Sequence, residues 1–186
     1  MSDPIVTIAT KSNEKFLHRK TGAFDFSKHS PAEVTDLIRR MRASMRAANG
    51  IGLSANQIGL PWKVFVAQVP DSDGTMKFYA IFNPQLEKMG GERVPLEEGC
   101  LSVPGVYGEV LRYPRVTLLG QDRRGKPLKI KAWGLLAHVF QHETDHLDGK
   151  LFIELTKNIR TVAVSERLAE REKKIANPQE HAAPSN

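Results

Sequence analysis

The sequence feature that most constrains the fold is the stretch QHETDHLDG, residues 141–149, in which two histidines lie four residues apart. From Gly134 the apolar residues follow helical spacing, and His142 and His146 extend the same stripe towards Gly149, a residue type that often ends a helix. Side chains four residues apart on an α-helix differ by about 40° in azimuth and ~6 Å in height. Both imidazoles can therefore reach one metal ion from the buried face of a helix.

Glu143 directly follows the first of these histidines. In H-E-x-x-H sites the glutamate touches a water on the ion without being a ligand itself. The other interpretation is that both histidines are core residues with hydrogen bonds to the backbone. His138 lies one turn earlier, but it stands ~12 Å from His146 along the helix axis and cannot share an ion with both histidines. We interpret it as a helix histidine with its own hydrogen-bond partner.

A third ligand should come from another segment, and Cys100 in EEGCLSVPG is the best candidate. A soft thiolate suits a mid-to-late transition metal, whereas the alternative is a buried cysteine that packs as a small apolar side chain. One cysteine and two histidines leave a tetrahedral position open, as in catalytic sites, where a bound water can have its pKa lowered to roughly 7. The ligand set alone indicates zinc.

The rest of the chain mixes helical and strand patterns. Residues 30–50 predict a helix, because Ser30 is a good N-cap, Pro31 suits the first turn and Asn49-Gly50 marks the exit. Short β-rich runs follow, separated by turns at PDSDG and DRRG; the runs are residues 62–69, 78–83, 106–113, 115–121 and 128–133. We therefore expect antiparallel or mixed sheets, with an N-terminal helix before them.

Length and composition are those of one soluble globular domain. The chain has 186 residues with 40% hydrophobic side chains, and no stretch approaches the ~20 apolar residues of a membrane span. The start of the chain lacks a secretory signal pattern, and one cysteine cannot form an intrachain disulfide, so we expect a cytoplasmic location. The net charge of +6 allows an acidic partner, but no specific nucleic-acid motif accompanies it, and we favour a basic surface that merely keeps the protein soluble.

The end of the chain is expected to form a C-terminal helix and a tail. Residues 158–175 suit a helix, and residues 157–175 carry a modest excess of Lys and Arg over Glu. The final stretch ANPQEHAAPSN has the polar composition of a frayed end. We therefore expect a single domain over residues 1–175 and a flexible tail over residues 176–186.

Three motifs, taken in order, resemble the signature motifs of peptide deformylases: GIGLSANQ (50–57), EGCLS (98–102) and QHETDHL (141–147). The resemblance extends from about Ile5 to Leu155. It implies an α+β fold, with antiparallel or mixed sheets packed around a central metal-binding helix. The implied metal is one divalent ion held by Cys100, His142 and His146, usually Fe(II) in the cell, with Zn, Ni or Co as substitutes. The resemblance also implies the family's reaction, which removes the formyl group from the N-terminal formyl-methionine of newly synthesised polypeptides.

The resemblance assigns the chemical steps to particular residues. Water activated at the metal attacks the formyl carbon, and the Gln57 amide and the backbone N–H of Leu101 stabilise the developing oxyanion. Glu143 takes a proton from the water and gives it to the leaving amine. A glycine-flanked loop around Gln57 agrees with this role, because backbone without side chains can lie close to a ligand.

Substrate binding is assigned in the same way. Ile51, Gly52 and Gly99 supply the backbone that holds an N-formylmethionyl peptide as an added strand, which explains broad acceptance beyond the first residue. Leu135 and Val139, one and two turns before His142, are expected to wall the pocket for the methionine side chain, and ordinary core contact is the equal alternative for both.

The sequence departs from the family pattern at three positions. Ser54 stands where the first motif usually has alanine, and adds a hydroxyl near Gln57. Tyr107 replaces a basic residue that many relatives carry after the motif cysteine, and His138 occupies a position that is commonly apolar or arginine. Relatives also suggest that Glu98 pairs with Arg112 and supports the metal site.

Two other functions remain open at this point. Another metallohydrolase, such as a peptidase, shares the H-E-x-x-H pattern, although common enzymes of that kind use a carboxylate or a third histidine in place of a thiolate. A binding protein that has lost catalysis is the second alternative, with its C-terminal helix docked on the ribosome as in some relatives. Ion pairs on a solvated helix face would explain the same charges.

Overall fold

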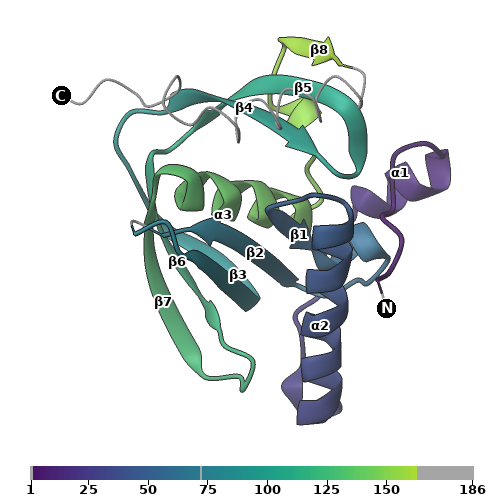
Figure 1. The fold of residues 1–186 in the computed structure, drawn as a ribbon. Helices are drawn as coiled ribbons and strands as arrows, with labels where there is room; N and C mark the ends of the chain where they lie inside the picture. The colour runs from purple at the N-terminus through teal and green to yellow at the C-terminus, as the bar shows by residue number, and fades with distance from the viewer. Residues whose placement is uncertain (1, 72, 163–186) are drawn as a thin grey trace.

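The chain folds into two antiparallel sheets with a helix between them. The computed structural model describes residues 2–71 and 73–162. Figure 1 shows helix α3 (Gly134–Leu147) between a five-stranded and a three-stranded sheet, with helix α2 (Pro31–Ala47) beside the larger sheet. The α+β fold with sheets around the histidine-bearing helix is confirmed.

The larger sheet has the strand order β1-β2-β3-β6-β7, and every pair in it is antiparallel. Its strands are β1 (Gly52–Ser54), β2 (Val64–Pro70), β3 (Met76–Gly90), β6 (Arg115–Gln121) and β7 (Pro127–Trp133). The predicted turn DRRG joins β6 to β7, where the Gly125 N–H donates to the Asp122 carbonyl oxygen at 2.9 Å. Strand β7 leads directly into α3, which fixes where the helix begins.

The smaller sheet has the order β4-β5-β8, with strands β4 (Val94–Cys100), β5 (Val103–Arg112) and β8 (Ile159–Thr161). Its register shifts at one end: Gly99 lies opposite Tyr107, but Cys100 lies opposite Val103. The chain therefore turns sharply at Leu101 and Ser102. This turn places Cys100 at the end of β4, beside α3.

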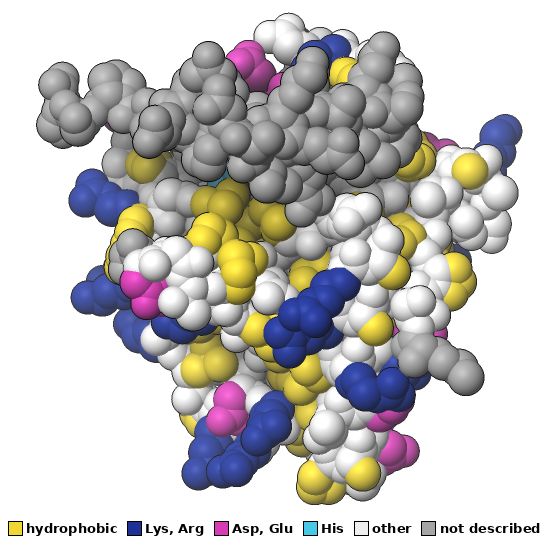
Figure 2. Space-filling model, in the orientation of Figure 1, with side chains coloured by type: hydrophobic (Ala, Val, Ile, Leu, Met, Phe, Trp, Pro, Cys, Tyr) yellow, Lys and Arg dark blue, Asp and Glu magenta, His cyan; other side chains and the backbone are white. Residues whose placement is uncertain are grey.

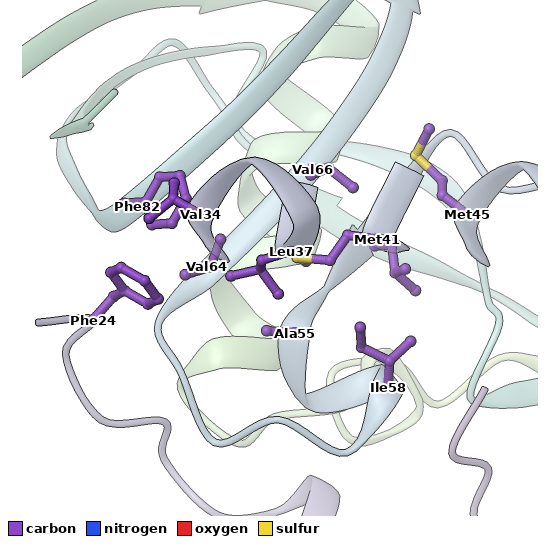
Figure 3. Packing of buried hydrophobic residues seen from close by; sticks show 11 residues of the cluster. Phe24, Val34, Leu37, Met41, Met45, Ala55, Ile58, Val64, Val66 and Phe82 are labelled. Atoms are coloured by element: carbon purple, nitrogen blue, oxygen red, sulfur yellow. The ribbon is translucent and has the colours of Figure 1, made fainter. Parts of the chain in front are cut away.

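Helix α2 forms between the two predicted end signals. The Ser30 hydroxyl accepts from the Glu33 N–H at 3.3 Å, and the Glu33 carboxylate accepts from the Ser30 N–H at 2.7 Å. At the other end Asn49 takes a left-handed conformation with a φ of 56°. Figure 3 shows the apolar face of α2, including Leu37 and Met41, packed with side chains of β2 and of the short helix η2 (Ala55–Ile58).

Helix α3 packs its other face on the larger sheet. Val139 and Phe140 belong to a buried cluster with Phe65 of β2 and Leu118 of β6. The Phe65 and Phe140 ring centroids lie 5.6 Å apart. These apolar contacts leave His142 and His146 on the side of α3 that faces the smaller sheet.

The expectation for the C-terminal helix is corrected at its beginning. Residues Ile159–Thr161 form strand β8, in which Arg160 lies opposite Tyr107 of β5. Pairing with the free edge of β5 outweighs the local helical pattern, because strand formation depends on cross-strand contacts more than on intrinsic preference. The remainder of that expected helix and the tail over residues 176–186 lie outside the described residues.

No helix within the described residues is long and apolar enough to span a membrane. On the face in Figure 2, Lys and Arg side chains form several separate groups with hydrophobic and acidic side chains between them. The basic side chains on this face therefore do not gather into one patch.

Candidate active site

Three candidate ligand atoms converge at the interface between α3 and the end of β4. The Cys100 sulfur lies 3.0 Å from His146 Nε2, and His146 Nε2 lies 3.2 Å from His142 Nε2. All three donor atoms are within 4.8 Å of one another. In a tetrahedral site with the usual zinc–sulfur and zinc–nitrogen bonds, donor atoms are separated by roughly 3.3 to 3.6 Å. The sequence-predicted set is thus brought together at nearly the spacing that one transition-metal ion requires.

The electrostatic surroundings favour the ligand form of Cys100. Burial alone would raise the pKa of its thiol, but the charges of His146 and His142 and their hydrogen bonds outweigh burial and lower the pKa to about 5. The sulfur is therefore a thiolate at neutral pH, which is the form that binds metals. The donor set fits a divalent transition-metal ion.

A buried carboxylate orients one of the two histidines. Glu98 of β4 accepts from His142 Nδ1 at 2.8 Å, which turns His142 Nε2 towards Cys100 and His146. Arg112 donates to the same carboxylate at 2.6 and 3.1 Å, so the expected pair forms. Burial alone would raise the pKa of Glu98, but hydrogen bonds from His138, His142 and Arg112 hold it well below its ordinary value. The Glu98 carboxyl therefore stays ionised and holds His142 in this orientation.

Glu143 lies between α3 and β1, with only 3% of its surface exposed. The Ser54 hydroxyl lies 2.7 Å from Glu143 Oε2, and a Cβ added at Gly52 would lie 2.2 Å from Glu143 Oε1. Burial raises the pKa of Glu143 above its ordinary value, and the neighbouring histidines and Ser54 offset this only in part. A carboxyl group with a raised pKa can accept and return a proton near neutral pH.

Gln57 faces the Cys100 sulfur from the short helix η2. Its amide nitrogen donates to the Ser102 hydroxyl at 3.2 Å and lies 3.5 Å from Cys100 Sγ, while its amide oxygen accepts from the Ser54 N–H at 2.9 Å. Leu101 lies in the turn between β4 and β5. Ser102 was not singled out from the sequence, and its only signal was its place two residues after the motif cysteine.

The predicted site residues share one cavity. Ten of the eleven line a single cavity of about 630 Å³, and the eleventh, His146, lies behind it with 1% of its surface exposed. Ile51 and Gly52 form one wall, Gly99 and Leu101 line it from the β4 side, and α3 supplies the rest. Leu135 is about half exposed and Val139 is buried, and both face this cavity.

The three departures also lie at this site. His138 lines the cavity and donates at 2.9 Å to Glu98, a carboxylate that it shares with His142, so it has a hydrogen-bond partner as expected. Tyr107 covers Gly99, where an added Cβ would lie 2.4 Å from the ring. The Arg160 guanidinium lies 5.7 Å from the centre of the Tyr107 ring and pairs with Glu97. Ser54 contacts Glu143 rather than Gln57 through its hydroxyl.

Solved structures of peptide deformylases are similar to this fold. A probable peptide deformylase from synechococcus phage S-SSM7 is 35% identical, has a TM-score of 0.72, and the match covers 81% of this chain and 97% of that one. A class I type b peptide deformylase from Acinetobacter baumannii with Met-Ala-Ser bound is 26% identical, with a TM-score of 0.75 and coverage of 83% and 98%. The fold is therefore that of peptide deformylases.

Sequence comparison gives the same family. A peptide deformylase of Picosynechococcus sp. is 38% identical over 139 residues, which are 75% of this chain and 73% of that protein. The model of the polypeptide deformylase family matches residues 5–162, which include all three sequence motifs and every candidate site residue. The chain therefore belongs to the polypeptide deformylase family, a family of metal-dependent hydrolases.

Proposed function

We propose that this protein removes the formyl group from the N-terminal formyl-methionine of newly synthesised polypeptides, with Cys100, His142 and His146 as the metal ligands. The observation that carries the proposal is the convergence of these three donor atoms beside the buried Glu143 carboxyl, at one cavity. Family membership supplies the reaction, in which a formamide C–N bond is hydrolysed and formate is released. The site residues have the side chains that the steps of this reaction need.

The ligand set holds one divalent ion per chain. The ion, when bound, acts as a Lewis acid that activates the attacking water. We propose Fe(II) as the ion in the cell, with Zn, Ni or Co as substitutes, because a thiolate and two imidazoles accept all of these metals. Glu98 keeps His142 turned towards the ion, and Arg112 holds Glu98 in place.

Glu143 moves the protons of the reaction. Its carboxylate takes a proton from the attacking water and gives it to the methionine nitrogen as the C–N bond breaks. The raised pKa of Glu143 suits this exchange, since the group must both accept and release a proton. Gln57, with its amide nitrogen 3.5 Å from Cys100 Sγ, and the backbone N–H of Leu101 donate to the oxyanion that forms on the formyl oxygen.

The cavity accounts for binding of the peptide. Ile51, Gly52 and Gly99 present backbone on its two sides, so an extended peptide can be held as an additional strand. Leu135 and Val139 provide an apolar wall for the methionine side chain. The peptide Met-Ala-Ser in the Acinetobacter baumannii enzyme has the chemistry of the corresponding product.

The experiment that tests this function is formate release from a formyl-Met-Ala-Ser peptide. The protein is loaded with Fe(II) without oxygen, beside a Glu143→Ala variant with the same metal content. Release by the parent and not by the variant would support the proposal. With one metal per chain confirmed, no release by either protein would contradict it, and cleavage of an unformylated peptide would favour a peptidase.

We also propose where in the cell this protein acts and what it contacts there. Because the substrate is a new polypeptide, we place the enzyme in the cytoplasm, acting as one domain over residues 1–175. Contact with the ribosome through the basic residues of 157–175 is proposed as well, although Arg160 already pairs with Glu97 within the fold. Deletion of residues 163–186 leaves β8 in place and should weaken cosedimentation with ribosomes; unchanged cosedimentation would contradict this contact.

A further inference from the structure

We propose that Ser54 is a positioning residue for the reaction: its hydroxyl fixes the Glu143 carboxyl group so that one oxygen is anchored and the other is presented to the cavity. The inference rests on the proposed deformylase function. It concerns a side chain that the sequence marked only as a departure from the family pattern.

Strand β1 places two residues against Glu143. Gly52 and Ser54 are two positions apart on the strand, so their Cα substituents point to the same face, and Leu53 between them belongs to the core on the other side. The Ser54 hydroxyl lies 2.7 Å from Glu143 Oε2. A Cβ added at Gly52 would lie 2.2 Å from Oε1. The carboxyl group is therefore held between these two positions.

The two carboxyl oxygens have different surroundings. Ser54 is fully buried, with 0% of its surface exposed, and it does not line the cavity. Gly52 does line the cavity, beside Oε1. Oε2 is thus bonded on the inner side, and Oε1 is left for the proton that moves during the reaction. A carboxyl group held in this way needs no rearrangement when substrate enters.

The same hydroxyl can keep its bond while the proton moves. Ser54 Oγ also lies 3.0 Å from the Glu143 carbonyl oxygen. A hydroxyl has one hydrogen and two acceptor lone pairs. It can donate to Oε2 when Glu143 is a carboxylate, and it can keep donating to Oε2 when Oε1 holds the proton, because Oε2 is an acceptor in both states. Neither state leaves a buried polar group without a partner.

Substitution by alanine isolates this contact. The backbone N–H of Ser54 donates to the Gln57 amide oxygen at 2.9 Å, and a Ser54→Ala variant keeps that bond. The change removes only the link to Glu143. Ser44 offers a matched control, because it is also buried, accepts from the Asp3 N–H at 2.7 Å and lies on α2 away from the cavity.

Steady-state kinetics with the formyl-Met-Ala-Ser peptide test the proposal at equal metal content. We expect Ser54→Ala to lower kcat about fivefold to tenfold, the effect of losing one ordinary hydrogen bond, with KM unchanged. Ser44→Ala should leave both constants at the parent values. An unchanged kcat for Ser54→Ala, or a change in KM alone, would overturn the positioning role.

A second background shows whether Ser54 acts through Glu143. In a Glu143→Asp protein the acidic side chain is one methylene shorter, so its carboxyl group withdraws from the Ser54 hydroxyl. Adding Ser54→Ala to that protein should then lower kcat less than twofold. An equal decrease of kcat in both backgrounds would overturn the proposal.

Crystal structures of the parent and of Ser54→Ala give a readout that needs no activity: we expect the Glu143 carboxyl to leave its place beside Gly52. A parent without formate release would reject the proposed function, whereas an unmoved carboxyl would reject the role of Ser54.

Discussion

At the scale of single residues, the buried Glu143 carboxyl leaves room only for glycine at position 52. An added Cβ would lie 2.2 Å from Glu143 Oε1, and Glu143 is buried, so the carboxyl would have to shift. We expect Gly52→Ala to lower kcat about a hundredfold, because misplacement of a catalytic group by ~1 Å costs that much. Gly90→Ala is the matched control, since nothing lies within 4 Å of its added Cβ. Formate release by both variants at equal metal content checks this, and a Gly52→Ala enzyme as fast as the Gly90→Ala enzyme would contradict it.

The reactivity of the Cys100 thiol should show whether a metal ion is bound. Its pKa is lowered to about 5, so in metal-free protein it should react with iodoacetamide almost as fast at pH 6 as at pH 8. An ordinary thiol changes its rate about a hundredfold over that range. Because Cys100 is the only cysteine, one mass increment measures the reaction. Added Zn²⁺ or Fe(II) should protect it. Strong pH dependence without metal, or no protection with metal, would show that the thiolate is not held as described.

At the scale of elements, the N-terminal cap of α2 should matter for stability and not for catalysis. The Ser30 hydroxyl accepts from the Glu33 N–H, and this end of α2 does not line the cavity. We expect Ser30→Ala to lower the free energy of unfolding by about 1 kcal/mol, whereas Ser30→Asp keeps an acceptor and most of the stability. Urea unfolding of the three proteins measures this. Equal losses for both variants would mean that the cap is not the cause.

The elements that could be predicted are those with clear local signals. Helix α2 has a cap, a proline in its first turn and a periodic apolar stripe, and the β6–β7 hairpin has a turn with Gly125 at a positive φ. Helix α1 (Lys11–Leu17) was missed because Leu17 is its only buried residue. Strand β1 has three residues, and β4 carries Pro95 and two adjacent glutamates, so neither has a recognisable alternation of apolar and polar residues.

Some features of the candidate site could likewise be predicted from the sequence, and others could not. Cys100, His142 and His146 could be predicted because ligand chemistry and helical spacing are local properties of the sequence. The roles of Ser54 and Ser102 could not, because both depend on which segments meet in space. Ser54 reaches Glu143 only because β1 lies against α3, and Ser102 reaches Gln57 only through the shifted register at the end of β4.

At the scale of the whole molecule, one buried ionic network joins the smaller sheet to the central helix. Arg112 of β5 pairs with Glu98 of β4 and with Asp145 of α3, and Glu98 also accepts from His138 and His142. The network lies where the smaller sheet faces α3, and it includes His142. Its integrity therefore couples the position of His142 to the packing of the two layers.

This network should make stability depend on acid pH. Because the folded-state pKa of Glu98 lies well below its unfolded value near 4.5, its contribution is present above that value and is lost as the pH falls below it. We expect Glu98→Gln to lower the free energy of unfolding of metal-free protein by about 3 kcal/mol at pH 7, since Arg112 loses a buried partner. The difference from the parent should shrink between pH 4.5 and pH 3 in urea unfolding. The exposed Glu92→Gln variant should match the parent at every pH, and a Glu98→Gln deficit that stays constant down to about pH 3 would mean that the ionised carboxylate is not what holds the sheet to the helix.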